Sequence, residues 1–102
     1  MLTFIDVIPA KGSIQTGEAL NLLGGAANDS SALETDISVW ARSDRGWTAL
    51  LTKRFQIGEK EHKHLYFTLP PECLMDFEDE LELIIRDTRP REDESGVMVF
   101  IG

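Results

Sequence analysis

Cysteine is nearly absent from this chain, since Cys73 is its only example in 102 residues. A single thiol excludes an intramolecular disulfide, and we interpret its side chain as a small buried hydrophobe of the Cys-Leu-Met run. A lone thiol is also compatible with a reducing compartment. At this length we expect a single domain, residues 1–102, that folds without metals or disulfides.

Basic residues are also scarce. The chain holds 10 Lys and Arg residues against 18 Asp and Glu residues, which gives a formal net charge of −8 at pH 7. This balance repels phosphate backbones and anionic lipid, so we expect neither a nucleic-acid partner nor a membrane partner.

Long apolar runs are missing as well. No stretch approaches the roughly 20 apolar residues of a membrane-spanning helix. No basic leader opens the chain and Asp6 interrupts the first apolar run, which argues against a secretory signal. If Met1 is the natural start, we expect a cytoplasmic protein; if the chain is excised from a longer one, an extracellular location stays open.

The usual signatures of catalysis and metal binding are not found. Gly24-Gly25 lacks the spacing of a phosphate-binding loop, and no Ser-His-Asp signature is present. His62 and His64 would share a face of a strand, but a structural zinc site normally needs four ligands. We therefore predict no catalytic residues, no metal site and no cofactor, so that the protein is not an enzyme.

Two acidic clusters, residues 76–82 and 87–94, lack the internal glycine that shapes a calcium loop. We interpret them as solvated corners. A small hydrolase that uses the first cluster is the weakest alternative, because it requires a pocket beside these carboxylates.

Alternation of apolar and polar residues is the main feature that is present. Leu81, Leu83 and Ile85 recur at a spacing of two, which predicts a strand whose core face they form. The same pattern predicts further strands at residues 3–8, 13–15, 18–28, 35–42, 47–57, 62–69 and 97–101. For residues 18–28 a short helix remains an alternative, and the two glycines indicate a bulge or a close backbone approach.

Seven or eight short strands separated by turns predict an all-β fold, an antiparallel Greek-key β-sandwich. Within it, residues 67–87 run from an apolar strand through Pro70-Pro71 and a short crossing, with one helical turn that buries Leu74 and Phe77, into a core strand. This stretch resembles the corner before the penultimate strand in immunoglobulin-like and fibronectin-like accessory domains. The tyrosine that often anchors such a corner is absent, and Phe77 has no hydroxyl to replace it. The resemblance implies an immunoglobulin-like β-sandwich with a binding or spacing role rather than an activity.

The outward positions of three strands are unexpectedly apolar. Trp40 alternates with Val39 and Ala41, and Ile84 lies between two core residues. The last strand is apolar on both faces. If these strands are neighbours, four side chains converge on a face that should be wet: Trp40, Ile84, Met98 and Phe100. The alternatives are that a loop covers this face or that the alternation has slipped by one residue.

From this face we predict a non-catalytic protein-interaction or assembly module that self-associates, as a homodimer or larger homo-oligomer. The alternative is a carbohydrate-binding or spacer β-sandwich module of a larger secreted enzyme. In that case Trp40, together with Tyr66 or Trp47, would form the sugar platform.

Overall fold

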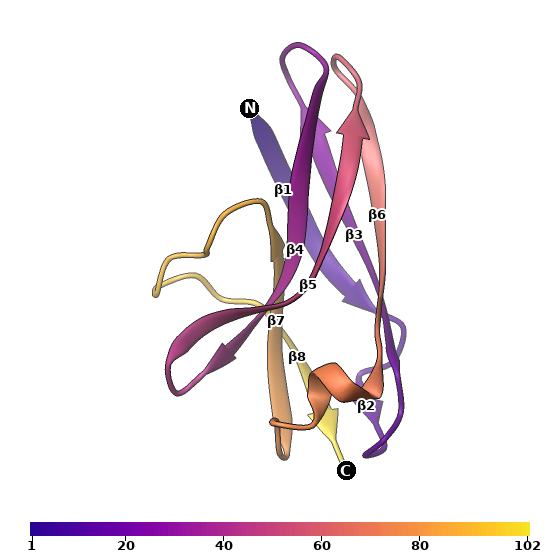
Figure 1. The fold of residues 1–102 in the computed structure, drawn as a ribbon, viewed down its shortest axis with the longest axis vertical. Helices are drawn as coiled ribbons and strands as arrows, with labels where there is room; N and C mark the ends of the chain where they lie inside the picture. The colour runs from indigo at the N-terminus through magenta and orange to yellow at the C-terminus, as the bar shows by residue number, and fades with distance from the viewer.

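The computed structural model describes residues 1–102, except for the side chain of Asp6, and is almost entirely β-structure. In chain order the elements are β1 (Leu2–Pro9), β2 (Ser13–Ile14), β3 (Leu20–Asn28), β4 (Leu33–Ser43), β5 (Gly46–Ile57), β6 (His62–Leu69), the 3-10 helix η1 (Pro71–Leu74), β7 (Glu80–Arg86) and β8 (Val97–Ile101). The molecule measures 43 × 25 × 18 Å, with its two termini toward opposite ends (Figure 1). The all-β prediction is confirmed. Within the described part, no helix has the length and apolar character needed to cross a membrane.

The strands form two sheets. One has the order β1-β3-β6, and the other has the order β2-β8-β7-β4-β5 (Figure 1). The predicted strand at residues 18–28 is confirmed as β3, which pairs with β1 and β6, so the helical alternative is wrong.

The prediction of an entirely antiparallel fold is wrong for one pair of strands. β2 pairs with β8 in parallel, at Ser13 with Phe100 and Ile14 with Ile101. The reason is that the chain leaves β1 at the edge of one sheet and crosses to the edge of the other after a short turn. It then runs beside β8 in the same direction for two residues.

The core lies between the two sheets, where the alternating side chains of facing strands meet. Leu81, Leu83 and Ile85 of β7 are at most 1% exposed, which confirms the predicted core face of this strand. Fully buried side chains from the other strands complete it: Leu20, Ile37, Val39, Ala41, Leu65, Leu69 and Val99. Burial of this apolar surface is the main source of stability.

The predicted close backbone approach occurs at Gly24. A Cβ atom there would lie 2.7 Å from Cδ1 of Ile85, so the missing side chain lets β7 pack tightly on β3. The predicted helical turn also forms, as η1, and buries Leu74, whereas Phe77 is only half-buried. Cys73 is half-buried rather than buried, and its thiol lies 3.5 Å from the carbonyl oxygen of Leu50.

Candidate functional site

The four residues of the predicted interface share the outer face of the five-stranded sheet. Trp40 pairs with Ile84 across β4 and β7, Glu82 pairs with Met98, and Glu80 pairs with Phe100. Directly paired residues point to the same side of a sheet, so this placement follows from the register.

Ile84 is the exception to the predicted exposure of this face. It is only 3% exposed, because residues 87–96, which we call the covering loop, fold over this part of the sheet. Pro90 of the loop is buried, and Arg89 lies 5.9 Å from the centre of the Trp40 ring. Trp40 is half-buried, and its indole Nε1 donates to the carbonyl oxygen of Arg86 at 3.2 Å. The prediction that Ile84 is free to meet a partner is therefore wrong in this conformation.

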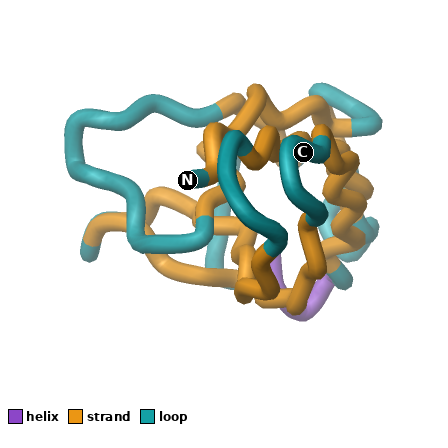
Figure 2. The backbone as a smooth tube through the Cα atoms, turned by 90° about the horizontal axis from the view of Figure 1, so that it is seen from above, coloured by secondary structure: helices purple, strands orange, loops and turns teal.

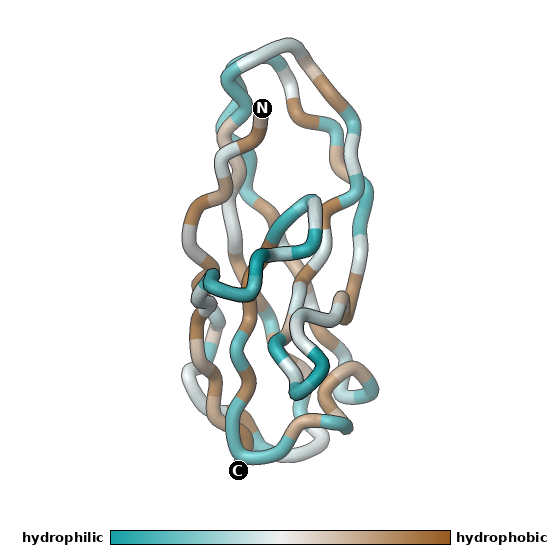
Figure 3. The backbone as a smooth tube through the Cα atoms, turned by 90° about the vertical axis from the view of Figure 1, so that its left-hand side faces the viewer, coloured by the Kyte–Doolittle hydropathy of each residue, from teal (hydrophilic) through white to brown (hydrophobic). Residues whose placement is uncertain are grey.

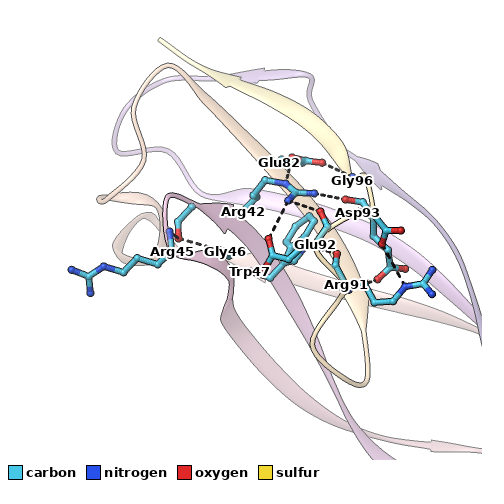
Figure 4. Close-up of polar contacts among 11 residues, drawn as sticks. Arg42, Arg45, Gly46, Trp47, Glu82, Arg91, Glu92, Asp93 and Gly96 are labelled. Carbon is cyan, nitrogen blue, oxygen red and sulfur yellow. Dashed lines mark hydrogen bonds and ion pairs between the residues drawn. The ribbon is translucent and has the colours of Figure 1, made fainter.

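Arg42 holds the covering loop in place (Figure 4). Its Nε donates to Glu82 Oε1 at 2.7 Å, and its two terminal nitrogens donate to the backbone carbonyls of Glu92, at 3.0 Å, and Glu94. Glu82 uses its second oxygen to accept from the backbone N–H of Gly96 at 2.7 Å. One ion pair thus fastens the C-terminal half of the loop, residues 92–96, to the sheet.

The same contacts bury Trp47. Its ring lies 4.4 Å below the guanidinium of Arg42, and its Nε1 donates to the carbonyl of Arg91 at 3.1 Å (Figure 4). The covering loop and the β4–β5 hairpin project from the same side of the molecule (Figures 1 and 2). The backbone on this side includes long hydrophilic segments (Figure 3). A small second core, separate from the one between the sheets, therefore lies beneath a polar loop.

Met98 and Phe100 do remain exposed, at 40% and 55%. They lie on β8, and the Arg42–Glu82 ion pair separates them from Trp40. The predicted interface is thus divided into a covered part and an exposed part.

A second apolar face, which the sequence analysis missed, lies on the outside of the three-stranded sheet. Ile5, Ile8 and Tyr66 are 51%, 61% and 63% exposed there. Ile5 pairs with Gly25, and Ile8 pairs with Leu23, which also pairs with Tyr66. The register shift between Ile5 and Ile8 turns both side chains outward although their spacing is odd. Simple alternation cannot reveal such a face; the unusually apolar sequence of β3 was the available signal.

The predicted sugar platform does not form as a unit. Tyr66 lies on the outer face of the three-stranded sheet, Trp40 lies on the other sheet, and Trp47 is fully buried. The aromatic neighbour of Tyr66 is His64, with ring centres 6.2 Å apart.

The acidic corner borders an open cavity of about 570 Å³, lined in part by Asp76, Glu78, Asp79 and Glu80. All four side chains are exposed. Among the residues that the structure describes, no group of three His, Cys, Asp or Glu side chains could hold a metal ion, and the predicted pair His62 and His64 is exposed.

The clear pKa shifts belong to surface ion pairs away from both faces. A hydrogen bond from Lys11 lowers the pKa of Glu18, and a hydrogen bond from Arg54 lowers the pKa of Glu34. The N-terminal ammonium lowers the pKa of Asp29 in the same way. Asp29 and Glu34 are exposed and Glu18 is half-buried at the surface, so we interpret the pairs as ordinary surface contacts.

Comparison with known proteins identified likeness of fold only. No family model and no curated protein matches the chain. Among solved structures, a β-glucosidase from Erythrobacter marinus is similar, with a TM-score of 0.80 and 12% identity over 100% of this chain. A β-glucosidase from Listeria innocua in complex with gluconolactone gives a TM-score of 0.71 and 14% identity over 99%.

A mutant of the Listeria innocua enzyme in complex with laminaribiose gives a TM-score of 0.65 and 16% identity. The chain spans only 15% to 16% of the length of these enzymes. The likeness therefore concerns one small part of each enzyme.

Proposed function

We propose that the protein is a non-catalytic protein-interaction module that self-associates through an apolar sheet face. The observation that supports this proposal is the location of its exposed large apolar side chains. Of the seven exposed large apolar side chains in the described structure, all but Met1 and Met75 lie on strands and point away from the core: Ile5, Ile8, Tyr66, Met98 and Phe100. Apolar side chains gathered on a sheet surface are typical of contact sites.

The acidic corner supports a hydrolase less well than the apolar faces support an interaction module. Acid–base catalysis by paired carboxylates needs a cleft that excludes water, whereas the cavity here is open and its four carboxylates are exposed. The prediction that the chain is not an enzyme is kept on this ground.

We also propose that the fold is immunoglobulin-like. In such sandwiches the first, second and fifth strands share one sheet, and the third, sixth and seventh share the other. If β2 is taken as an addition to the edge, the order β1-β3-β6 against β8-β7-β4 follows this division. The fourth strand, β5, pairs with β4 rather than joining the sheet of β1, as the fourth strand of constant-type domains does. An experimental structure with a different strand order would contradict the proposal.

Sedimentation equilibrium from about 10 µM to about 1 mM tests self-association. We expect the average mass to rise with concentration above that of the 11.4 kDa monomer. A constant monomer mass over this range would contradict the proposal. The same sample should hydrolyse no β-glucoside, and turnover by the purified chain would contradict the non-catalytic part.

A second candidate function is an accessory module of a larger glycoside hydrolase. It is favoured by the match of the whole chain to about one sixth of the β-glucosidases. This candidate predicts that the same or a neighbouring reading frame encodes a glycoside hydrolase catalytic domain that co-purifies with the chain. Its sugar-binding form further predicts a shift of Tyr or Trp fluorescence on titration with laminaribiose. Absence of such a reading frame would count against this candidate, and an unchanged spectrum would count against its sugar-binding form.

A further inference from the structure

The outer face of the three-stranded sheet is arranged as two ridges around a low centre. Ile5 and Ile8 of β1 form one ridge, and His64 and Tyr66 of β6 form the other. Between them, β3 contributes its half-buried residues Leu23, Gly25 and Ala27. A Cβ atom on Gly25 would lie 3.3 Å from Cδ1 of Ile5, so the glycine lets Ile5 lie close against the sheet. The face is therefore low and apolar at its centre.

This face is exposed because the covering loop lies over the other sheet (Figure 1). Ile5, Ile8 and Tyr66 each keep more than half of their surface accessible. On the inner side of β1, Leu2, Phe4 and Val7 already pack against the core. Burial of the outward set can therefore come from a second molecule without any rearrangement of the core.

The distribution of charge is the feature from which we argue for a second copy of the chain. The chain carries 18 acidic residues, but the sequences of β1, β3 and β6 include only one of them, Asp6. Two copies with a net charge of −8 repel each other over most of their surfaces. They meet with least repulsion where both surfaces are apolar and low in charge, which is the condition that this face provides.

The size of the face sets the strength of the contact. With about 4.8 Å between strands and about 3.3 Å per residue, a face three strands wide and about six residues long measures roughly 15 by 20 Å. Two such faces with their side-chain relief would bury on the order of 1,000 Å² in total, below the standard interface of about 1,600 Å². An area below that of a standard interface is typical of a weak, reversible dimer.

We propose that a second copy of this chain packs face to face on the outer surface of the three-stranded sheet, where the ridges that carry Ile5, Ile8 and Tyr66 make the contact. This inference rests on the proposed function and identifies the face that self-association uses. It assigns the contact to β1, β3 and β6 rather than to Met98 and Phe100 on β8. The aliphatic ridge of β1 favours a protein over a sugar, because Ile5 and Ile8 offer neither an aromatic ring for stacking nor a hydrogen-bonding group.

The test compares variants on the two faces by sedimentation equilibrium. Tyr66→Glu places a charge in the proposed contact, and Ile8→Thr removes apolar surface while keeping a residue that favours strands. Phe100→Glu is the matched control on β8. We expect the first two variants to raise the dissociation constant at least tenfold and threefold, respectively, and the control to leave it within twofold. Thermal unfolding identifies any variant that fails to fold. If Tyr66→Glu fails to fold, Ile8→Thr alone decides the test.

The outcomes separate this inference from the proposed function. Dissociation caused by Phe100→Glu alone would overturn the inference and leave self-association standing. A wild-type monomer at every concentration would overturn both. Saturable binding of laminaribiose by titration calorimetry, lost in Tyr66→Glu, would reassign the face to sugar and also overturn the inference.

Discussion

Gly96 is the residue at which the backbone itself leaves least room. A Cβ atom there would lie 2.2 Å from the carbonyl oxygen of Leu83, a backbone atom that cannot rotate away. Its N–H also donates to Glu82, so movement of the backbone would weaken the fastening of the covering loop. The steric limit and the hydrogen bond together restrict position 96, directly before β8, to glycine.

We expect Gly96→Ala to lower the free energy of unfolding by about 2–3 kcal/mol, since overpacking at a fixed backbone forces the strand to shift. Gly12→Ala is the matched control, because a Cβ atom at Gly12 would meet nothing within 4 Å. Urea unfolding followed by circular dichroism measures both. Equal stability of the two variants would show that β8 can yield at this position.

At the scale of single elements, the covering loop has the greatest effect on the candidate site. It converts Ile84 and Trp47 from surface residues into a second core, and Arg42 makes the contacts that keep it closed. The alternation in β4 and β7 was enough to predict that Trp40 and Ile84 point away from the core between the sheets. It could not predict the cover, because a bond from a guanidinium to distant backbone carbonyls leaves no periodic trace in the sequence.

We expect Arg42→Ala to destabilise the protein by about 2 kcal/mol, because Oε1 of Glu82 and two loop carbonyls lose their donor. The loop should open and let water reach Trp47, which shifts the tryptophan emission to longer wavelength and increases quenching by acrylamide. Arg42→Lys keeps the charge but loses the planar fork, so its effect should be intermediate. An emission spectrum identical to that of the wild type in Arg42→Ala would show that the loop closes without this residue.

The strands also differ in how well the sequence predicted them. Strict alternation predicted most of the strands and the inward residues of β4, β6 and β7, because a buried face imposes a period of two. It predicted both β1 and β2 as strands but missed two of their features: an irregularity between Ile5 and Ile8 shifts the phase of β1, and β2 pairs with β8 in parallel. The exposed face on the three-stranded sheet was missed because of the first of these features.

At the scale of the whole molecule, net charge opposes every contact between copies. Two molecules at −8 repel each other over distances comparable to the Debye length, which shortens from about 30 Å at 0.01 M salt to about 10 Å at 0.1 M. We therefore expect the dimer to strengthen several-fold when sodium chloride rises over this range, as measured by sedimentation equilibrium. Weakening with salt would indicate attraction between opposite charges across the contact and would contradict an apolar interface.

The covering loop also has a consequence for proteolysis. Arg91 is exposed on it, between two acidic neighbours and the buried Pro90, and its peptide carbonyl is held by Trp47. A trypsin cut after Arg91 would release no fragment at once, because the C-terminal piece contains β8, which stays paired with β7 and β2. A nicked protein of this kind would run as one species in native conditions and as two peptides after denaturation.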